Sequence, residues 1–337
     1  MKAVGLTRYL PITDEQSLQD IELPKPNASG RDLLVKINAV GVNPVDTKVR
    51  KPKDKIETSP KVLGWDACGI VEAVGDKVSQ FNVGDKVYYA GDITRQGCNA
   101  EYQLIDERIV GLAPQTLTSA QAAAMPLTTV TAWEALFERM KISQNKSDNA
   151  NKSILILGGA GGVGSIAIQL AKQVAGLTVI ATASRTDTIA WVKNLGADIV
   201  VNHHHLLADM QTQHLIPDYI LCNSDTDAYF AIMAELIKPQ GHICSIVETA
   251  ASVDLGLLKN KSASFSWEFM FARSMYQTDD MQKQGDILNR VSQLIDNGTL
   301  KHTAKTELKP INAANLRAAH AQLESGNTIG KIVLSGW

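Results

Sequence analysis

The segment 153–176 restricts the fold of this chain more than any other. It begins with an apolar run at 153–157, passes through a glycine-rich stretch and continues with apolar residues at helical spacing. Gly159, Gly161 and Gly164 form the pattern G-x-G-x-x-G between the predicted strand and the predicted helix. The first glycine permits a tight turn, the second lets backbone approach a pyrophosphate, and the third lets the helix pack closely on the strand. The segment therefore predicts a dinucleotide-binding turn.

The residues around this turn also select the type of phosphate site. A P-loop requires Gly-Lys-Ser/Thr after its glycines, but Ser165 follows Gly164 here. A pyrophosphate at the N-terminus of the following helix is the better interpretation, because free N–H groups and the helix dipole favour an anion there. The residues predicted to bind the cofactor at this turn are Gly159, Gly161, Gly162, Val163 and Gly164.

Strands and helices alternate through residues 126–272. This alternation is typical of strand–helix–strand units and, with the glycine turn, predicts a doubly wound, parallel-sheet Rossmann domain that binds a dinucleotide. After the glycine turn we expect strands at 178–183, 199–201, 218–221 and 242–247, with helices at 186–195 and 229–237.

Residues 1–125 have a different pattern, with short strands separated by turn residues. The pentapeptide Val-Gly-Asp-Lys-Val occurs at both 74–78 and 83–87, as expected for two turns of one sheet. We therefore expect a β-barrel domain here. Residues 273–337 contain a predicted helix at 312–323 and a strand at 331–334, and we expect them to return to the first domain.

The end of the second Rossmann strand bears on the choice of cofactor. NAD sites place an acidic residue about 20 positions beyond the glycines, where it holds the ribose hydroxyls. Here that place contains Ser184 and Arg185, which can hydrogen-bond a 2′-phosphate, so we predict NADPH. The alternative is that Arg185 is an ordinary solvated residue. Asn202 or His203, after the next strand, could contact the adenine-ribose end.

Composition excludes several other classes of protein. The 33 Lys and Arg residues nearly balance the 35 Asp and Glu residues, so we expect neither nucleic-acid nor membrane binding. The first residues contain no signal-peptide core and no segment has the apolar length of a membrane span, which predicts a cytoplasmic protein. The four cysteines are widely spaced, which argues against a disulfide scaffold and a zinc ribbon.

Several motifs along the chain resemble the medium-chain dehydrogenase/reductase superfamily, and specifically its quinone oxidoreductase branch and the zinc-type alcohol dehydrogenase-like proteins. They are GVNPVD at 41–46, GWDACGIVEAVG at 64–75, TAWEAL at 131–136, GGAGGVG at 158–164 and the terminal GKIVL. The resemblance implies a GroES-like catalytic domain, a Rossmann cofactor domain, a cleft between them and a homodimer.

The resemblance also allows a test for zinc. It places the metal ligands of zinc-dependent relatives at Asn43, Trp65 and about Leu127, none of which is a plausible zinc ligand. The run His203-His204-His205 is a weak metal candidate, because adjacent residues do not share a face of a helix or strand. We therefore predict no metal.

Without a metal, the stabilisation that an alkoxide needs during alcohol oxidation is missing. Reduction of an activated acceptor remains feasible, because hydrogen-bond donors can stabilise a delocalised enolate. The predicted function is zinc-independent transfer of a hydride from NADPH to a quinone or an α,β-unsaturated carbonyl. The alternatives are an NADPH-binding redox sensor with little turnover and a metal-free carbonyl or alcohol dehydrogenase.

The same resemblance suggests individual site residues. Asn43 is expected to donate to the substrate oxyanion or, alternatively, to cap its turn. Lys48, where related quinone reductases often carry Tyr, either offers an ammonium to the oxyanion or faces solvent. Thr131 matches a nicotinamide contact. Asp46 and Trp65 are expected to line the substrate pocket, with local structural roles as the alternative; Ile246 and Val247 are expected beside the nicotinamide.

An aromatic and sulfur-rich cluster lies at 266–275. We interpret it first as the core of a domain or dimer interface and second as the lining of a substrate pocket. Its members are Trp267, Phe269, Met270, Phe271 and Met275. Arg273 within it could approach the cofactor or an interface carboxylate.

Overall fold

The computed structural model describes residues 1–337 and divides the chain into two compact units. The first unit combines Met1–Val130 with Phe271–Trp337, and the second is the continuous segment Thr131–Met270. The first boundary lies a few residues later than the one expected between residues 125 and 126. Helix α3 (Pro126–Trp133) spans this boundary, so the helical pattern begins before the second unit does.

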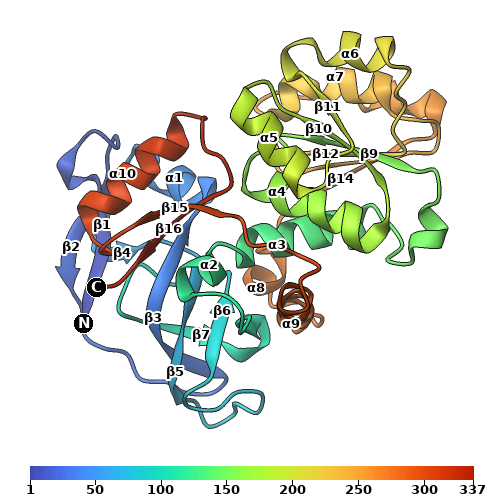
Figure 1. The fold of residues 1–337 in the computed structure, drawn as a ribbon. Helices are drawn as coiled ribbons and strands as arrows, with labels where there is room; N and C mark the ends of the chain where they lie inside the picture. The colour runs from blue at the N-terminus through green and yellow to red at the C-terminus, as the bar shows by residue number, and fades with distance from the viewer. The chain divides into compact units, whose positions relative to one another are not determined.

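The first unit is built mainly from antiparallel strands (Figure 1). Its larger, seven-stranded sheet has the order β15-β16-β3-β5-β6-β8, with β7 also paired to β3. These strands are β15 (Ala304–Leu308), β16 (Lys331–Ser335), β3 (Asp32–Val42), β5 (Asp66–Val74), β6 (Lys86–Tyr89), β8 (Val110–Leu112) and β7 (Tyr102–Asp106). A three-stranded sheet contains β2 (Gln19–Glu22), β1 (Lys2–Tyr9) and β4 (Lys53–Val62).

The C-terminal segment is part of the first unit. Strand β16 pairs antiparallel with β3, with Val333 opposite Gly41. Helix α10 (Ala313–Glu324) packs on α1 (Pro44–Arg50), where the buried Arg50 side chain donates to the backbone oxygen of Leu10 and to His320 of α10. The other helices of this unit are α2 (Ser119–Ala123), α8 (Ala272–Tyr276) and α9 (Lys283–Asp296).

The second unit contains a six-stranded, all-parallel sheet with the order β11-β10-β9-β12-β13-β14. Figure 1 shows α4 and α5 on one side of this sheet and α6 and α7 on the other. The strands are β9 (Ser153–Leu157), β10 (Thr178–Thr182), β11 (Ile199–Val201), β12 (Tyr219–Cys222), β13 (His242–Ser245) and β14 (Ser264–Trp267). The helices are α4 (Gly162–Gln169), α5 (Thr186–Leu195), α6 (Leu206–Thr212) and α7 (Thr226–Leu236). The predicted fold class, a GroES-like barrel with a doubly wound Rossmann domain, is confirmed.

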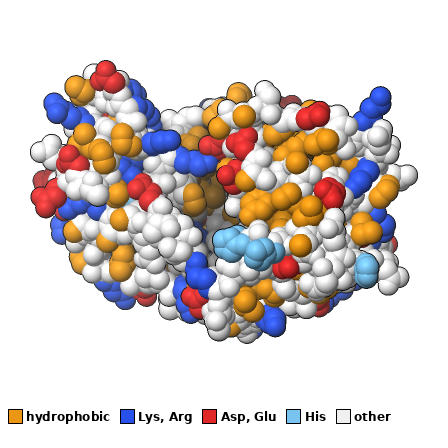
Figure 2. Space-filling view, turned by 90° about the horizontal axis from the view of Figure 1, so that it is seen from above, with side chains coloured by type: hydrophobic (Ala, Val, Ile, Leu, Met, Phe, Trp, Pro, Cys, Tyr) orange, Lys and Arg blue, Asp and Glu red, His pale blue; other side chains and the backbone are white.

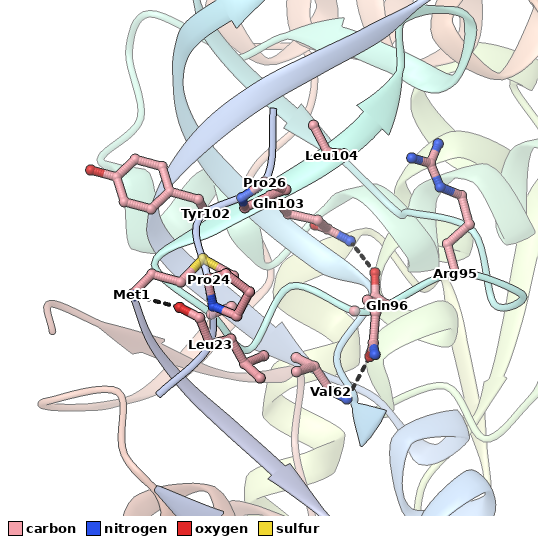
Figure 3. A pocket seen from close by; sticks show the side chains of 12 residues that line it. Met1, Leu23, Pro24, Pro26, Val62, Arg95, Gln96, Tyr102, Gln103 and Leu104 are labelled. Carbon is pink, nitrogen blue, oxygen red and sulfur yellow. Dashed lines mark hydrogen bonds between the residues drawn. The ribbon is translucent and has the colours of Figure 1, made fainter. Parts of the chain in front are cut away.

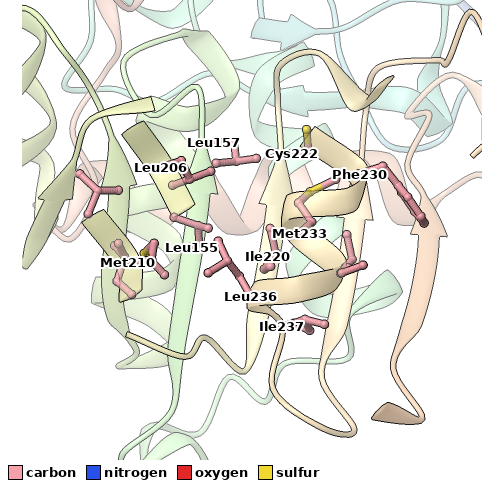
Figure 4. Packing of buried hydrophobic residues seen from close by; sticks show 14 of the residues in the cluster. Leu155, Leu157, Leu206, Met210, Ile220, Cys222, Phe230, Met233, Leu236 and Ile237 are labelled. Atoms are coloured by element: carbon pink, nitrogen blue, oxygen red, sulfur yellow. The ribbon is translucent and has the colours of Figure 1, made fainter. Parts of the chain in front are cut away.

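One apolar core lies between this sheet and helices α6 and α7 (Figure 4). Leu155 and Ile220 from adjacent strands meet Met210 of α6 and Phe230 and Met233 of α7. Because strands of a parallel sheet are covered on both faces, their sequences are apolar runs without alternation. The core therefore explains why the strands of this unit are recognisable in the sequence.

Two features of the second unit were not predicted. Strand β14 has only four residues, Ser264–Trp267, and forms one edge of the sheet. The helix that begins at Gly162 continues as π-helix from Leu170 to Ala175 before Gly176 ends it in the left-handed conformation. No helix in the chain combines the length and the apolar character that crossing a membrane requires.

The aromatic and sulfur-rich cluster at 266–275 does not form a single core. Met270 and Phe271 are buried, whereas Trp267 and Phe269 are each 47% exposed and Met275 is 36% exposed. Arg273 is buried in the first unit and forms an ion pair with Asp280.

Candidate functional site

The glycine turn after β9 has the geometry of a cofactor cradle. A Cβ atom at Gly164 would lie 2.3 Å from the backbone oxygen of Gly158, so the third glycine is required for the close approach of helix and strand. A Cβ at Gly161 would meet only that same oxygen, at 3.5 Å, so this position faces open space. The Gly158 amide, at a positive φ of 72°, donates to the Thr182 hydroxyl (2.9 Å) and joins the turn to β10.

Helix α4 begins directly above this open space. Its N-cap is Gly161, which has no side chain to bind the N–H groups of the first turn. These N–H groups, which belong to Gly162, Val163 and Gly164, therefore remain suited to an anion, and the helix dipole adds to the attraction. The residues at the turn fit the pyrophosphate of a dinucleotide cofactor.

The end of β10 carries a cation and no carboxylate. Arg185 is exposed and is the N-cap of α5, and Ser184 before it is half-buried. The nearest acid in the chain is Asp187, whose carboxylate lies 3.4 Å from the Arg185 Nε and accepts from the Thr188 amide (2.8 Å). A phosphate at Arg185 would have to compete with this exposed carboxylate.

The next strand, β11, ends beside the end of β10. Thr182 and Val201 are register partners in the parallel pair β10–β11, and the Ala183 amide donates to the Val201 carbonyl (3.1 Å). Asn202 is half-buried and caps the following 3₁₀ turn, because its side-chain oxygen accepts from the His204 amide (3.0 Å). The Asn202 oxygen is therefore used locally, and its side-chain amide group is the part suited to a ligand.

Ile246 and Val247 follow β13 and are half-buried. The Ile246 amide donates to the Cys222 carbonyl (3.1 Å), and the Val247 carbonyl accepts from the Thr226 hydroxyl (2.5 Å). Two of the backbone groups that we expected to serve a nicotinamide carboxamide are thus bonded within the unit. Thr131, also predicted to contact nicotinamide, is buried in α3.

The first unit contains a buried polar network that centres on Asp66. The Lys331 ammonium lies 2.9 Å from the Asp66 Oδ2 and 2.9 Å from the Val42 carbonyl, and it also donates to the side-chain oxygen of Asn43. The Asn43 amide group donates to the Asp66 Oδ2 (2.8 Å), and the Leu127 backbone N–H donates to the Asp66 Oδ1 (2.7 Å). Asp66, Asn43 and Lys331 are each at most 3% exposed.

Asn43 also begins helix α1. Its backbone N–H donates to the Asp46 Oδ2 (2.6 Å), which is the reciprocal contact of a capping box. The second carboxylate oxygen of Asp46 is buried and has no hydrogen-bond partner. Burial raises the pKa of Asp46 to about 7, against the backbone hydrogen bond from Asn43 and the charge of Lys331, which lower it. Asp46 thus closes the first turn of α1, while the Asn43 side chain is bonded to Asp66 and Lys331.

Trp65 and Lys48 have contrasting surroundings. Trp65 has no exposed surface; its indole N–H donates to the Asp92 carbonyl (3.1 Å) and its ring packs edge-on against Phe271. This placement favours the packing role of Trp65. Lys48 lies on the exposed side of α1.

The three positions at which we expected the metal ligands of zinc-dependent relatives all lie next to Asp66, either in contact or in sequence. Asn43 and Leu127 both bind Asp66, and Trp65 precedes it in the chain. An amide, an indole and a leucine are not zinc ligands, and the cation at this point is the Lys331 ammonium. No group of three or more His, Cys, Asp or Glu side chains in the structure is arranged to hold a metal ion. The donor set does not fit a catalytic zinc.

Asp66 and Lys331 were not among the predicted site residues. The signal was present, since both lie in quoted motifs, Asp66 in GWD and Lys331 in GKIVL. Nothing in the sequence alone pairs two residues 265 positions apart.

A separate pocket of about 320 Å³ lies in the first unit (Figure 3). Met1 lines it together with Leu23 and Pro24, which follow β2, and Arg95, Gln103 and Leu104 line it from later segments. None of the predicted site residues lines this pocket, so it is not the candidate active site.

The chain is similar in sequence to known dehydrogenases over almost its whole length. Residues 29–131 match the family of alcohol dehydrogenase GroES-like domains, and residues 195–334 match the family of zinc-binding dehydrogenases. The chain is 45% identical to a zinc-type alcohol dehydrogenase-like protein of Staphylococcus epidermidis, over 99% of each chain. It is 31% identical to the chloroplastic NADPH-dependent alkenal/one oxidoreductase of Arabidopsis thaliana, over 92% of this chain and 73% of that one.

A solved structure gives the same result for the fold. The crystal structure of a protein of Rhizobium etli, described as a zinc-dependent alcohol dehydrogenase, superimposes with a TM-score of 0.95 at 52% sequence identity. The match covers 100% of this chain and 98% of that one. With its barrel unit, its glycine turn and these relatives, the chain belongs to the medium-chain dehydrogenase/reductase superfamily of oxidoreductases.

Proposed function

We propose that this oxidoreductase reduces quinones or α,β-unsaturated carbonyl compounds with NADPH and without a catalytic metal. The observation that carries the proposal is the Lys331 ammonium, which is bound to Asp66 and Asn43 where zinc-dependent relatives gather their metal ligands. The similarity to a relative named as an NADPH-dependent alkenal/one oxidoreductase supports the acceptor class.

The electrostatics of the network argue against a divalent cation beside it. The Asp66 carboxylate already accepts hydrogen bonds from Lys331, Asn43 and the Leu127 amide. A divalent ion would have to displace the ammonium or lie next to it. Two cations that are neighbours in a buried site repel each other strongly. The negative charge of Asp66 is therefore already balanced by the positive charge of Lys331.

Without a Lewis acid, the reaction must generate a charge that hydrogen bonds alone can stabilise. NADPH, when bound, would supply a hydride, and a quinone or an enone would delocalise the resulting negative charge over oxygen and carbon. A proton from water or a nearby side chain would then complete the reduction. We propose that Lys48, exposed on α1, donates to this developing oxyanion, while Asn43, Asp46 and Trp65 hold the segment that carries it.

The second unit supplies the cofactor contacts in this proposal. The pyrophosphate binds at the α4 N-terminus, against the turn formed by Gly159, Gly161, Gly162, Val163 and Gly164. Ser184 and Arg185 bind the 2′-phosphate, and Asn202 contacts the adenine-ribose end. Ile246, Val247 and Thr131 lie beside the nicotinamide.

The decisive experiment follows NADPH or NADH oxidation by absorbance, with quinones, enals, enones and simple aldehydes as acceptors, before and after dialysis against a strong chelator. A zinc-dependent alcohol dehydrogenase serves as the control that chelation must inactivate. We expect chelator-resistant NADPH oxidation with quinones or enones. Chelator-sensitive alcohol or aldehyde turnover contradicts the proposal, and tight NADPH binding without turnover of any acceptor points to the redox-sensor alternative.

We further propose a homodimer formed through β14. This strand is an edge of the sheet, and Trp267 and Phe269 at its end are each 47% exposed. The Ser264 amide donates to the Gly241 carbonyl and the Glu268 amide donates to the Ser245 carbonyl. The alternating N–H groups of Phe265 and Trp267 therefore point away from β13, as an edge that accepts another strand requires. Sedimentation of a Trp267→Ser/Phe269→Ser variant is expected to give monomers, and Ile216→Ser, at another exposed position, is expected to remain dimeric.

A further inference from the structure

The histidine run after β11 has no role in the function proposed above. His203, His204 and His205 form a 3₁₀ turn between β11 and α6. His203 is half-buried and its ring lies 4.1 Å from the ring of His204, while His204 and His205 are exposed. Histidine side chains gather in an exposed patch on the face seen in Figure 2. Histidine is the side chain whose charge a nearby anion can switch near neutral pH, and His203 is the member of the run that lies closest to the sheet.

His203 and Arg185 both follow the carboxyl ends of neighbouring strands of the parallel sheet. Strands β10 and β11 are parallel neighbours whose last register partners are Thr182 and Val201. Arg185 follows Thr182 by three residues and His203 follows Val201 by two, so both lie beyond the same edge of the sheet. Burial lowers the pKa of His203, and the charges of His204 and Arg185 lower it further, which reflects this proximity. The two strand ends therefore present the Arg185 guanidinium and the His203 imidazole near each other.

The acidic groups nearby are already engaged. Asp187, at the start of α5, lies 3.4 Å from Arg185 and accepts from the Thr188 amide. Asp209, on α6, accepts from the backbone N–H of Asn202 (2.9 Å). Neither carboxylate contacts the His203 ring. The groups that act on its charge are His204, on the same turn, and Arg185, at the N-cap of α5. A bound phosphate would place a negative charge beside the His203 ring, in addition to the Asp187 carboxylate that already lies at Arg185.

We infer that His203 and Arg185 together bind the phosphate that distinguishes NADPH from NADH, and that protonation of His203 makes the preference for NADPH strongest at acid pH. The inference rests on the proposed NADPH dependence and adds a specificity residue to it. Arg185 provides a permanent charge, whereas His203 provides a charge that the solution can remove.

The sign of the pH effect follows from linkage. In the free protein, Arg185 disfavours the protonated form of His203. A phosphate dianion between the two favours that form, so its binding raises the pKa of His203 and takes up a proton. The added affinity is complete below the pKa of the free protein and is lost as the pH rises through the higher pKa of the complex. One unit of difference between the two pKa values corresponds to about tenfold in affinity.

The test measures dissociation constants of NADP⁺ and NAD⁺, chosen because they resist acid, by calorimetry from about pH 6.5 to about pH 8.5, above the second pKa of a phosphate monoester at about 6. We expect the ratio of NAD⁺ to NADP⁺ dissociation constants to fall over this range in the wild type, by less than the roughly tenfold of one full unit, because the range begins above the lowered pKa of His203 in the free protein. In His203→Gln the ratio should be constant and close to the alkaline wild-type value, with NAD⁺ affinity unchanged. His205→Gln, a neighbouring exposed position, should behave as wild type.

The outcomes separate two kinds of failure. A preference for NADP⁺ that does not change with pH, or that changes equally in the wild type and in His203→Gln, overturns the role of His203 and leaves the proposed cofactor intact. Equal affinity for NADP⁺ and NAD⁺ at every pH overturns the proposed cofactor and this inference together. A second readout is proton uptake on NADP⁺ binding, measured in buffers of different ionisation enthalpy. Uptake should occur in the wild type and be absent in His203→Gln.

Discussion

The two units differ in where their charged and polar groups lie and in what those groups bind. In the first unit, the Lys331 ammonium, the Asp66 carboxylate and the Asn43 amide are buried and bonded to one another. In the second, the α4 N-terminus lacks a side-chain cap, and Arg185 is exposed and paired with the exposed Asp187. A network that is buried and bonded internally stabilises the fold, whereas exposed groups at the ends of helices and strands can bind a ligand. Substitutions should therefore affect stability in the first unit and affinity in the second.

The largest effect is expected at Lys331. Lys331→Met leaves the Asp66 carboxylate buried without its cation, which should cost about 3–5 kcal/mol in the free energy of unfolding. Denaturant unfolding measures this loss. Lys283→Met, which removes an exposed ion pair with Asp280 in the same unit, should change stability by less than about 0.5 kcal/mol. Similar losses in the two variants would mean that the network is not buried in solution.

A somewhat smaller effect is expected at Asp46, whose folded-state pKa is about 7 because of burial. Below about pH 4 the carboxyl is protonated in both states. Between about pH 4 and about pH 7 only the unfolded state releases its proton, so the stability of the wild type should fall as the pH rises, by about 2–4 kcal/mol. Asp46→Asn keeps an oxygen acceptor for the Asn43 amide and should lack this decline. Unfolding curves at several pH values test this, and equal pH slopes would count against a buried, protonated Asp46.

In the second unit, Arg185→Ala should act on affinity. Loss of a charge-assisted contact with the 2′-phosphate should weaken NADPH binding by about 10- to 100-fold, with little effect on NADH and on stability. Fluorescence titration with both cofactors measures the difference. Equal losses for NADPH and NADH would show that Arg185 does not recognise the phosphate.

The smallest effect is expected at Asp187, which competes with the phosphate for Arg185. Asp187→Asn should tighten NADPH binding about two- to fivefold, in keeping with an exposed ion pair of about 0.5–1 kcal/mol. NADH binding should stay the same, and a parallel gain for both cofactors would instead indicate a general electrostatic effect. The gain should disappear in Arg185→Ala/Asp187→Asn.

The sequence predicts those parts of the molecule that depend on neighbouring residues. The glycine turn, the helix that follows it and the strand Ile199–Val201 each have a local pattern, and the resulting fold class is confirmed. Strand β14 was missed because four residues, Ser264–Trp267, are too few for a period to be recognised. Its exposed Trp267 and the buried Phe271 look equally apolar in the sequence, and only packing separates them.

The site residues illustrate the same limit. Arg185 and Ser184 could be proposed from their distance to the glycines, because that distance is set by one strand–helix–strand unit. The partners of Asn43 could not, because Lys331 reaches it only through the pairing of β16 with β3. Whether a polar residue serves a ligand or the fold depends on such distant partners, and both roles had to stay open for Asn43 and Trp65.

The late position of Lys331 has a consequence for biosynthesis. A ribosome completes the continuous second unit before it makes β16, so that unit can fold while the first unit is still missing a strand and the cation for Asp66. A nascent or truncated chain that lacks β16 would carry an exposed edge at β3 and an uncompensated acid. Such intermediates would be natural targets for chaperones and proteases, because β16 supplies both the missing strand and the missing cation.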